Sequence, residues 1–179
     1  MIYVFLAMGF EEIEALATVD ILRRAELEVV TVGVGGSVVR GSHGITVAAD
    51  IRDTEATQEG LEGIVLPGGM PGTLNLEHSP VVQHFLDVAV EKGLWIAAIC
   101  AAPSILGHRG LLNGRRAVCF PGYEQELTGA HVTQAAVETD GRLITACGAG
   151  ASVEFALRIV AEMVSPERSA KLKASLQCR

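Results

Sequence analysis

The sequence predicts an α/β protein in which helices cover both faces of a mostly parallel sheet. Short apolar, β-branched runs alternate with amphipathic helical stretches along the chain, as in repeated βαβ units. Hydrophobic residues make up 49% of the 179 residues and charged residues 20%, and no segment is dominated by Pro, Ser or Gln. This composition excludes intrinsic disorder, and the length predicts a single domain that spans residues 1–179.

The first βαβ unit is expected near the N-terminus. Residues 1–7 are a continuous apolar run that indicates a strand, and a second such run follows at 28–34. Residues 11–25, between the two runs, carry acidic side chains in their first turn, which favours a helix there. The buried face of this helix is predicted from apolar residues spaced i, i+4, i+8, namely Ile13, Ala17 and Ile21.

Three further elements are expected before residue 93. Residues 38–49 alternate apolar and polar side chains around two glycines, which predicts a β-hairpin appended to the sheet. Residues 63–66 are typical of a buried strand. Pro67, Gly68 and Gly69 follow in a turn whose backbone N–H groups can face a ligand. A helix over 79–92 follows a Ser cap and begins with Pro; its apolar side consists of Val81, Phe85, Val88 and Ala89.

The C-terminal half continues the alternation of strands and helices. Residues 94–99 form a fully apolar strand, which turns at Cys100 directly into a helical stretch over 100–106 with Pro103 in its first turn. The remaining expected elements are a strand at 117–120, a short helix near Glu124, strands at 132–138 and 143–147 around Asp140-Gly141, a helix over 152–164 and a helix from Pro166 onward.

The charge balance excludes several functional classes. The chain carries 14 Lys+Arg against 21 Asp+Glu, a formal charge of -7, and its basic residues are scattered, so we expect no nucleic-acid binding. The apolar N-terminus lacks a basic leader, and no apolar run approaches the ~20 residues that span a bilayer. Four cysteines without a C-x-x-C pair favour free thiols in a reducing compartment. We expect a cytoplasmic protein without membrane association.

Cys100 is the main candidate for a reactive residue. Ligands of open parallel sheets bind at the carboxyl ends of the strands, and Cys100 follows such a strand. A thiol in the first turn of a helix experiences the positive end of the helix dipole, which favours the reactive thiolate and predicts a lowered pKa. The alternative is that Cys100 is a small buried hydrophobe, as free cysteines often are.

Four other residues would complete a site around this sulfur. Glu14 falls at the edge of the apolar stripe of its helix, where burial would raise the pKa of its carboxyl and allow proton transfer; a solvated first-turn acid is the alternative. The N–H of Ala101 and an N–H from the Gly68-Gly69 turn could stabilise an oxyanion at a carbonyl attacked by the thiolate. The glycines would otherwise only make a tight loop.

The remaining cysteines and histidines carry weaker signals. No histidine follows Cys100 at a strand end, so a Cys-His-Asp triad is not predicted. Cys119 and Cys147 both fall at expected strand ends, where a resolving thiol or a thiolate metal site with Cys100 is a minor alternative to simple burial. Cys178 is expected to be an exposed thiol in the C-terminal tail.

Four segments together resemble the ThiJ/PfpI superfamily, and most closely its branch with the parkinsonism-associated protein deglycase and YajL. They are Glu11-Glu12-Ile13-Glu14, Leu66-Pro67-Gly68-Gly69, Ala97-Ala98-Ile99-Cys100-Ala101-Ala102-Pro103 and Glu154-Phe155-Ala156-Leu157. The resemblance implies a flavodoxin-like three-layer α/β/α sandwich and a homodimer. It also implies a nucleophilic, oxidation-prone Cys100, a protonated Glu14, and a backbone oxyanion site at Gly69 and Ala101.

The chain departs from the family pattern at three candidate accessory positions. Phe120 replaces a histidine near the cysteine, His43 replaces an arginine of the hairpin, and Cys147 replaces the arginine that begins an Arg-Gly-Pro-Gly turn. The first change removes a proton donor, which leaves the proton transfers to Glu14. The other two weaken an anion site beside the cysteine.

The resemblance implies a glyoxalase or protein deglycase that acts on methylglyoxal, glyoxal or their adducts. In this reading Cys100 adds to an aldehyde and Glu14 moves the protons, with no metal or organic cofactor. The alternative is an oxidative-stress sensor or chaperone that responds to oxidation of Cys100. A peptidase is not expected, because Ala101 rather than histidine follows the nucleophile.

Overall fold

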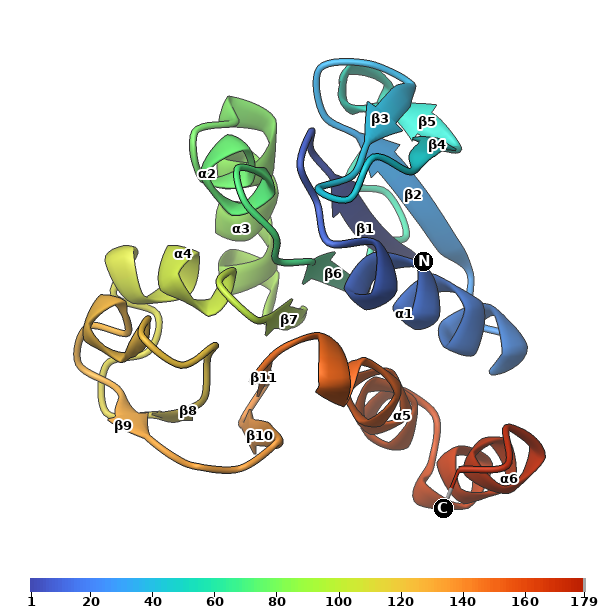
Figure 1. Ribbon diagram of the computed structural model, residues 1–179, viewed down its shortest axis with the longest axis vertical. Coiled ribbons are helices and arrows are strands. Elements are labelled where there is room, and N and C mark those ends of the chain that lie inside the picture. The colour runs from blue at the N-terminus through green and yellow to red at the C-terminus, as the bar shows by residue number, and fades with distance from the viewer. Residues whose placement is uncertain (179) are drawn as a thin grey trace.

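Seven strands form the central sheet of the computed structural model, which describes residues 1–178 (Figure 1). Their order is β10-β11-β7-β6-β1-β2-β5, and all neighbouring pairs are parallel except β10 with β11. This arrangement confirms the mostly parallel sheet predicted from the sequence. The strands are β1 (Ile2–Leu6), β2 (Val29–Gly33), β5 (Ile51–Arg52), β6 (Gly63–Leu66), β7 (Trp95–Ile99), β10 (Val137–Asp140) and β11 (Leu143–Ala146).

Helices cover both faces of this sheet, which gives the three-layer sandwich (Figure 1). One hydrophobic cluster joins the sheet to α1 and α5 and includes Leu22 and Phe155; the other joins it to α3 and α4 and includes Phe85 and Leu106. Helix α6 adds Leu172 to the first cluster. The helices are α1 (Glu12–Arg24), α2 (Gly72–Glu77), α3 (Pro80–Lys92), α4 (Pro103–His108), α5 (Ser152–Met163) and α6 (Pro166–Ser175). Within residues 1–178, no helix has the length and apolarity needed to cross a membrane.

Local sequence signals explain where α3 begins and ends. The Ser79 side chain accepts a hydrogen bond from the N–H of Val82, and Pro80 occupies the first helical position, where its missing N–H costs nothing. The helix ends at Gly93, whose φ of 62° is left-handed and therefore favours glycine. The predicted helix over 79–92 is confirmed.

Short strands outside the central sheet correct parts of the prediction. The predicted hairpin is confirmed, with strands β3 (Val38–Arg40) and β4 (Thr46–Ala48) paired antiparallel. The two strands form a small sheet of their own that is not part of the central sheet. Strands β8 (Arg116–Ala117) and β9 (His131–Val132) form a second small sheet, and most of 117–120 and 132–138 is not strand. After β8 the N–H of Val118 donates to Oγ1 of Thr145 and the N–H of Phe120 donates to the Cys100 carbonyl, so neither takes part in a strand ladder.

The buried face of α1 differs from the predicted one. Ile13 is 58% exposed, whereas Glu12 and Glu14 are only 4% and 1% exposed. The apolar stripe is formed by Ala15, Val19, Ile21 and Leu22, which pack on the sheet. The apolar stripe is displaced from the predicted face because the first turn of α1 buries the carboxylates of Glu12 and Glu14, which accept hydrogen bonds from His43 and Gly68. Hydrophobicity alone therefore does not set the orientation of this helix.

The strand order places several turns at one edge of the sheet. From β1 the chain first adds β2 on one side and later adds β6 on the other, so the order switches between β1 and β6. At such a switch point the connections leave the carboxyl ends of neighbouring strands in different directions and open a site there. Residues 7–14, 67–72 and 100–102 all follow strands at this edge.

Candidate active site

Cys100 lies immediately after β7 in a strained backbone conformation. Its φ is 66°, a left-handed value that non-glycine residues rarely adopt. Two hydrogen bonds fix this bend, because the N–H of Cys100 donates to Ala146 at 2.9 Å and its carbonyl accepts from Phe120 at 2.8 Å. Helix α4 begins only at Pro103, so the expectation that the helix starts at residue 100 is wrong.

Glu14, in the first turn of α1, provides a buried carboxyl group beside this sulfur. Its Oε2 accepts a hydrogen bond of 2.8 Å from the N–H of Gly68, whereas its Oε1 is buried without a hydrogen-bond partner among residues 1–178. Burial raises the pKa of Glu14 to about 7, against the opposing interactions with the Cys100 thiol and the Gly68 N–H. The raised pKa is the one predicted from the sequence.

The pKa of Cys100 is shifted in the opposite direction from the prediction. Burial and, next, the negative charge of the Glu14 carboxylate raise it to about 12, although the N–H groups of Ala101 and Gly69 favour the thiolate. The predicted lowering by the helix dipole is wrong, since α4 starts three residues later and is only six residues long. In the singly protonated pair, the proton therefore resides on sulfur and the carboxylate of Glu14 can accept it.

Gly68 allows the thiol and the carboxyl to approach each other. A Cβ at this position would lie 2.6 Å from the Cβ of Cys100 and 2.7 Å from Oε2 of Glu14. Gly69 is equally restricted, because its φ is 89° and a Cβ would lie 2.5 Å from the backbone nitrogen of Glu11. Both glycines predicted as binding residues are thus required by the geometry of the turn.

A Gly68→Ala variant is therefore expected to react faster at Cys100 with an electrophile such as iodoacetamide, because the added methyl group forces the thiol away from the Glu14 carboxylate, whose negative charge raises the pKa of Cys100. Gly36→Ala is the matched control, since a Cβ there meets no atom within 4 Å. The measurement is the rate of carbamidomethylation of Cys100 by mass spectrometry. Equal rates for both variants and the wild-type protein would contradict the role assigned to this glycine.

Phe120 lies near the sulfur, and Cys147 directly follows the strand next to the one that Cys100 follows. The Phe120 side chain is 46% exposed, and a Cβ on Gly148 would lie 3.1 Å from its ring and 3.9 Å from the Cys100 Sγ. Cys147 directly precedes Gly148 and borders a cavity of about 320 Å³ that Cys119 also lines. The structure thus brings these two predicted accessory positions to the site, although Phe120 supplies no proton donor.

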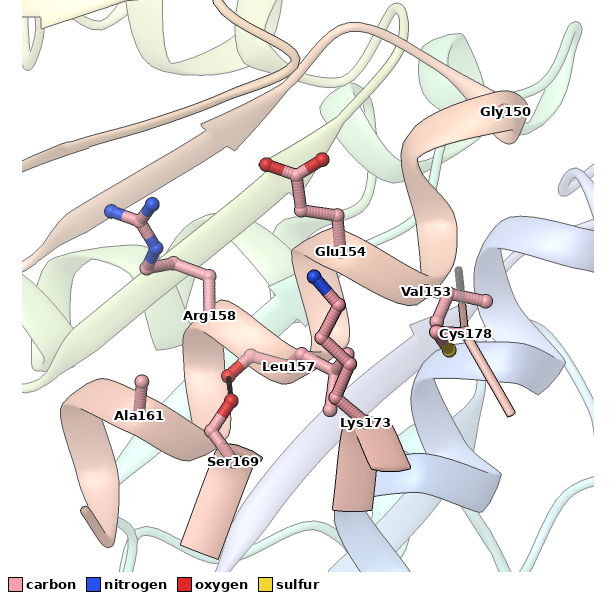
Figure 2. A pocket seen from close by; sticks show the side chains of 9 residues that line it. All are labelled: Gly150, Val153, Glu154, Leu157, Arg158, Ala161, Ser169, Lys173 and Cys178. Atoms are coloured by element: carbon pink, nitrogen blue, oxygen red, sulfur yellow. Dashed lines mark hydrogen bonds between the residues drawn. The ribbon is translucent and has the colours of Figure 1, made fainter. Parts of the chain in front are cut away.

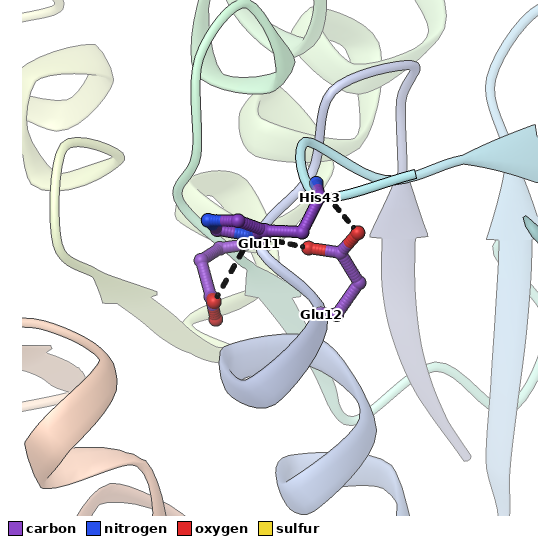
Figure 3. Close-up of side chains that lie close together, drawn as sticks. All are labelled: Glu11, Glu12 and His43. Atoms are coloured by element: carbon purple, nitrogen blue, oxygen red, sulfur yellow. Dashed lines mark hydrogen bonds and ion pairs between the residues drawn. The ribbon is translucent and has the colours of Figure 1, made fainter. Parts of the chain in front are cut away.

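His43 binds the N-terminus of α1 instead (Figure 3). Its Nδ1 lies 2.9 Å from Oε2 of Glu12 and 3.8 Å from a carboxylate oxygen of Glu11, and its backbone N–H donates to Glu12. Burial raises the pKa of Glu12, but these hydrogen bonds outweigh burial and lower it to about 2. The cluster thus attaches the hairpin to α1.

The same three side chains are the group best placed to hold a metal ion. One ligand atom from each of Glu11, Glu12 and His43 lies within 4.8 Å of the others, and no other group of three His, Cys, Asp or Glu residues in the described chain is as close. The thiolate metal site considered for Cys100, Cys119 and Cys147 is therefore not formed.

A separate groove of about 530 Å³ lies between α5 and α6 (Figure 2). Charged side chains of Glu154, Arg158 and Lys173 line it, together with Cys178. Cys178 is partly buried there, so it is not the exposed tail thiol expected from the sequence. Neither Cys100 nor Glu14 lines this groove.

Comparisons with known proteins agree with this architecture. A family model described as the DJ-1/PfpI family matches residues 1–162. Parkinson disease protein 7 homolog from Danio rerio is 39% identical over 179 residues, which covers 97% of this chain and 94% of the relative. Glutathione-independent glyoxalase DJR-1.2 from Caenorhabditis elegans is 32% identical, covering 90% and 87%. The structure of oxidized Toxoplasma gondii DJ-1 superposes with a TM-score of 0.94 at 33% identity, covering 98% and 97%.

Proposed function

This chain belongs to the DJ-1/PfpI family, and from that premise we propose that it converts small α-dicarbonyls such as methylglyoxal into hydroxy acids. Glyoxal and the adducts that such aldehydes form on proteins are substrates of the same chemistry. A relative from Caenorhabditis elegans is named a glutathione-independent glyoxalase, which supports this class of reaction. Cys100 acts as the nucleophile and Glu14 as the group that moves protons.

The observation that carries the proposal is the environment of the Glu14 carboxyl. It is 1% exposed, one oxygen is held by Gly68, and the other is buried with no partner in the described chain. Burying a carboxyl costs free energy that a structural role alone would not recover, particularly with an unsatisfied oxygen. The free oxygen is available to exchange a proton with Cys100 or with a bound substrate.

The first step joins the sulfur to the aldehyde carbon of methylglyoxal. As the C–S bond forms, the thiol proton passes to the Glu14 carboxylate, and the aldehyde oxygen takes the negative charge. The N–H groups of Gly69 and Ala101, which favour the Cys100 thiolate, are the donors that we assign to that oxyanion. Protonation of the oxyanion by Glu14 gives a hemithioacetal and regenerates the carboxylate.

The second step isomerises the hemithioacetal. The carboxylate of Glu14 removes the hydrogen from the former aldehyde carbon and returns a proton to the neighbouring carbon. The hydroxyl proton of the hemithioacetal moves to the oxygen of that neighbouring carbon, which converts the adduct to a thioester of lactate. Water then cleaves the thioester and releases lactate and the Cys100 thiol. The overall change adds one water to methylglyoxal without net oxidation or reduction, because the aldehyde carbon is oxidised while the ketone carbon is reduced. This route therefore requires no external oxidant or reductant, and no metal or organic cofactor takes part in it.

The rate of lactate formation is expected to depend on pH through Glu14. Below its pKa of about 7 the carboxyl is protonated and cannot accept the thiol proton, so kcat/KM falls about tenfold per pH unit. The measurement is lactate from methylglyoxal, detected by proton NMR, between about pH 5 and pH 9 at constant ionic strength.

Absence of lactate across this range would refute the proposed function. Lactate formation that does not change with pH, or that falls only near the ordinary glutamate pKa of 4.5, would refute the role of Glu14 while leaving the activity in place.

A second candidate function, redox sensing through Cys100, is favoured by one specific observation. Cys147 lies beside Cys100 at the end of the neighbouring strand, because the register pairs Ile99 with Ala146. Two thiols at such positions can respond to an oxidant together. The two functions use the same sulfur and are compatible in one protein.

A further inference from the structure

Cys147 follows strand β11 directly, just as Cys100 follows strand β7. The two strands are parallel neighbours, and their register pairs Ile99 with Ala146. The N–H of Cys100 donates to the Ala146 carbonyl at 2.9 Å, so the two segments are still hydrogen-bonded where they reach the cysteines. The two thiols therefore occupy equivalent positions at the ends of adjacent strands.

This placement matches the spacing that a disulfide requires. Neighbouring strands lie about 4.8 Å apart, and the Cα atoms of a disulfide lie roughly 4.4–6.8 Å apart. The chain also remains close to the sulfur after Cys147, since a Cβ on Gly148 would lie 3.9 Å from the Cys100 Sγ. The backbone spacing at these two positions is thus compatible with a disulfide.

The side of the sheet distinguishes Cys147 from the other cysteine in this region. Cys100 and Cys147 are both partly exposed and both pack against the hydrophobic cluster of α1 and α5. Cys119 is 5% exposed and belongs to the cluster on the opposite face of the sheet. Because Cys119 and Cys147 also border one cavity, a disulfide between Cys119 and Cys147 is the competing outcome.

We propose that Cys147 is the resolving thiol for Cys100, so that a hydroperoxide converts the pair to an intrachain disulfide. The proposal shares the nucleophilic sulfur with the proposed function but does not depend on any aldehyde chemistry. Its consequence is reversible inactivation, in which the disulfide protects Cys100 from further oxidation.

The hydroperoxide oxidises the two cysteines in two steps. The Cys100 sulfur attacks one oxygen of the hydroperoxide, the O–O bond breaks, and the thiol proton passes through the Glu14 carboxylate to the departing oxygen, which leaves as water or an alcohol. This oxidises Cys100 to the sulfenic acid and reduces the hydroperoxide. The Cys147 thiol then attacks the sulfenic sulfur, the S–O bond breaks, and water leaves with the Cys147 proton. A thiol reductant reopens the resulting disulfide.

The test is treatment of the reduced full chain with one equivalent of hydrogen peroxide, followed by non-reducing peptide mapping in the presence of dimedone. The wild-type protein is expected to yield a peptide that links Cys100 to Cys147 and to lose sulfenic-acid labelling by dimedone. Cys147→Ser is expected to accumulate dimedone-labelled Cys100. With a further equivalent of peroxide and no dimedone, it is expected to form the sulfinic acid of Cys100, which a thiol reductant does not reverse. Cys119→Ser, the matched control, is expected to keep the link.

Two outcomes overturn the inference. Equal dimedone labelling of the wild type and Cys147→Ser without any linked peptide shows that Cys147 does not resolve Cys100, and a link between Cys119 and Cys147 shows that the other pairing forms. Lactate formation by the reduced wild-type protein is measured separately. A protein that makes lactate but no disulfide therefore contradicts this inference alone, and one that makes the disulfide but no lactate contradicts the proposed function alone.

Discussion

Cys100→Ser is expected to form no detectable lactate from methylglyoxal. The substitution keeps a small polar side chain at the left-handed bend but replaces the thiol by an alcohol, which is a far weaker acid and nucleophile at neutral pH. The Glu14 carboxylate, with a pKa of about 7, can assist transfer of a thiol proton but not of an alcohol proton. Product analysis by proton NMR at saturating methylglyoxal measures the loss.

Cys178→Ser is the matched control for this variant, because Cys178 is also partly exposed but lies in the groove between α5 and α6. It is expected to retain wild-type activity. Lactate formation by Cys100→Ser within about tenfold of the wild-type rate would show that the sulfur is not the nucleophile.

Glu14→Gln is expected to reduce kcat/KM by about 10²–10⁴-fold, the usual contribution of a positioned acid or base. Glutamine has nearly the same shape and can still accept the hydrogen bond from Gly68, but it cannot take a proton from Cys100. Steady-state rates at about pH 8, where wild-type Glu14 is ionised, give the comparison. A rate close to that of the wild type would exclude proton transfer through this carboxyl.

Thermal unfolding separates this effect from a loss of folding. The folded state raises the pKa of Glu14 from 4.5 to about 7, so it binds more protons than the unfolded state between these values, and stability falls as pH rises through that window. Ionised Glu14 therefore lowers the free energy of unfolding by about 3 kcal/mol above pH 7. Glu14→Gln removes this cost and is expected to unfold at a higher temperature than the wild type at about pH 8, but not at about pH 4.

The alternation of apolar runs and helical stretches was sufficient to predict the layered α/β sandwich. Strong local signals also predict where individual helices begin, as Ser79 and Pro80 do for α3. The shortest elements could not be predicted, because β5 has two residues and α2 has six, too few to establish a periodicity. Their formation depends on the neighbouring strands and turns.

The residues of the candidate site and the raised pKa of Glu14 could be proposed from the sequence, whereas the raised pKa of Cys100 could not. Turns after parallel strands meet at one edge of the sheet, which allowed Glu14, Gly68 and Cys100 to be associated from the sequence. The pKa of Cys100 could not be predicted in this way, because it depends on burial and on the distance to the Glu14 carboxylate. The partner of His43 was also unpredictable, since it depends on how the hairpin folds against α1.

The protonation of the Glu14 carboxyl beside Cys100 can be observed directly by carbon-13 NMR. The side-chain carboxyl resonance of Glu14, assigned with the Glu14→Gln variant, is followed as a function of pH in the reduced protein. The account predicts a midpoint near 7. A midpoint near 4.5, the ordinary value for glutamate, would show that this carboxyl is ionised and solvated like a surface acid, and would contradict its role as the base for Cys100.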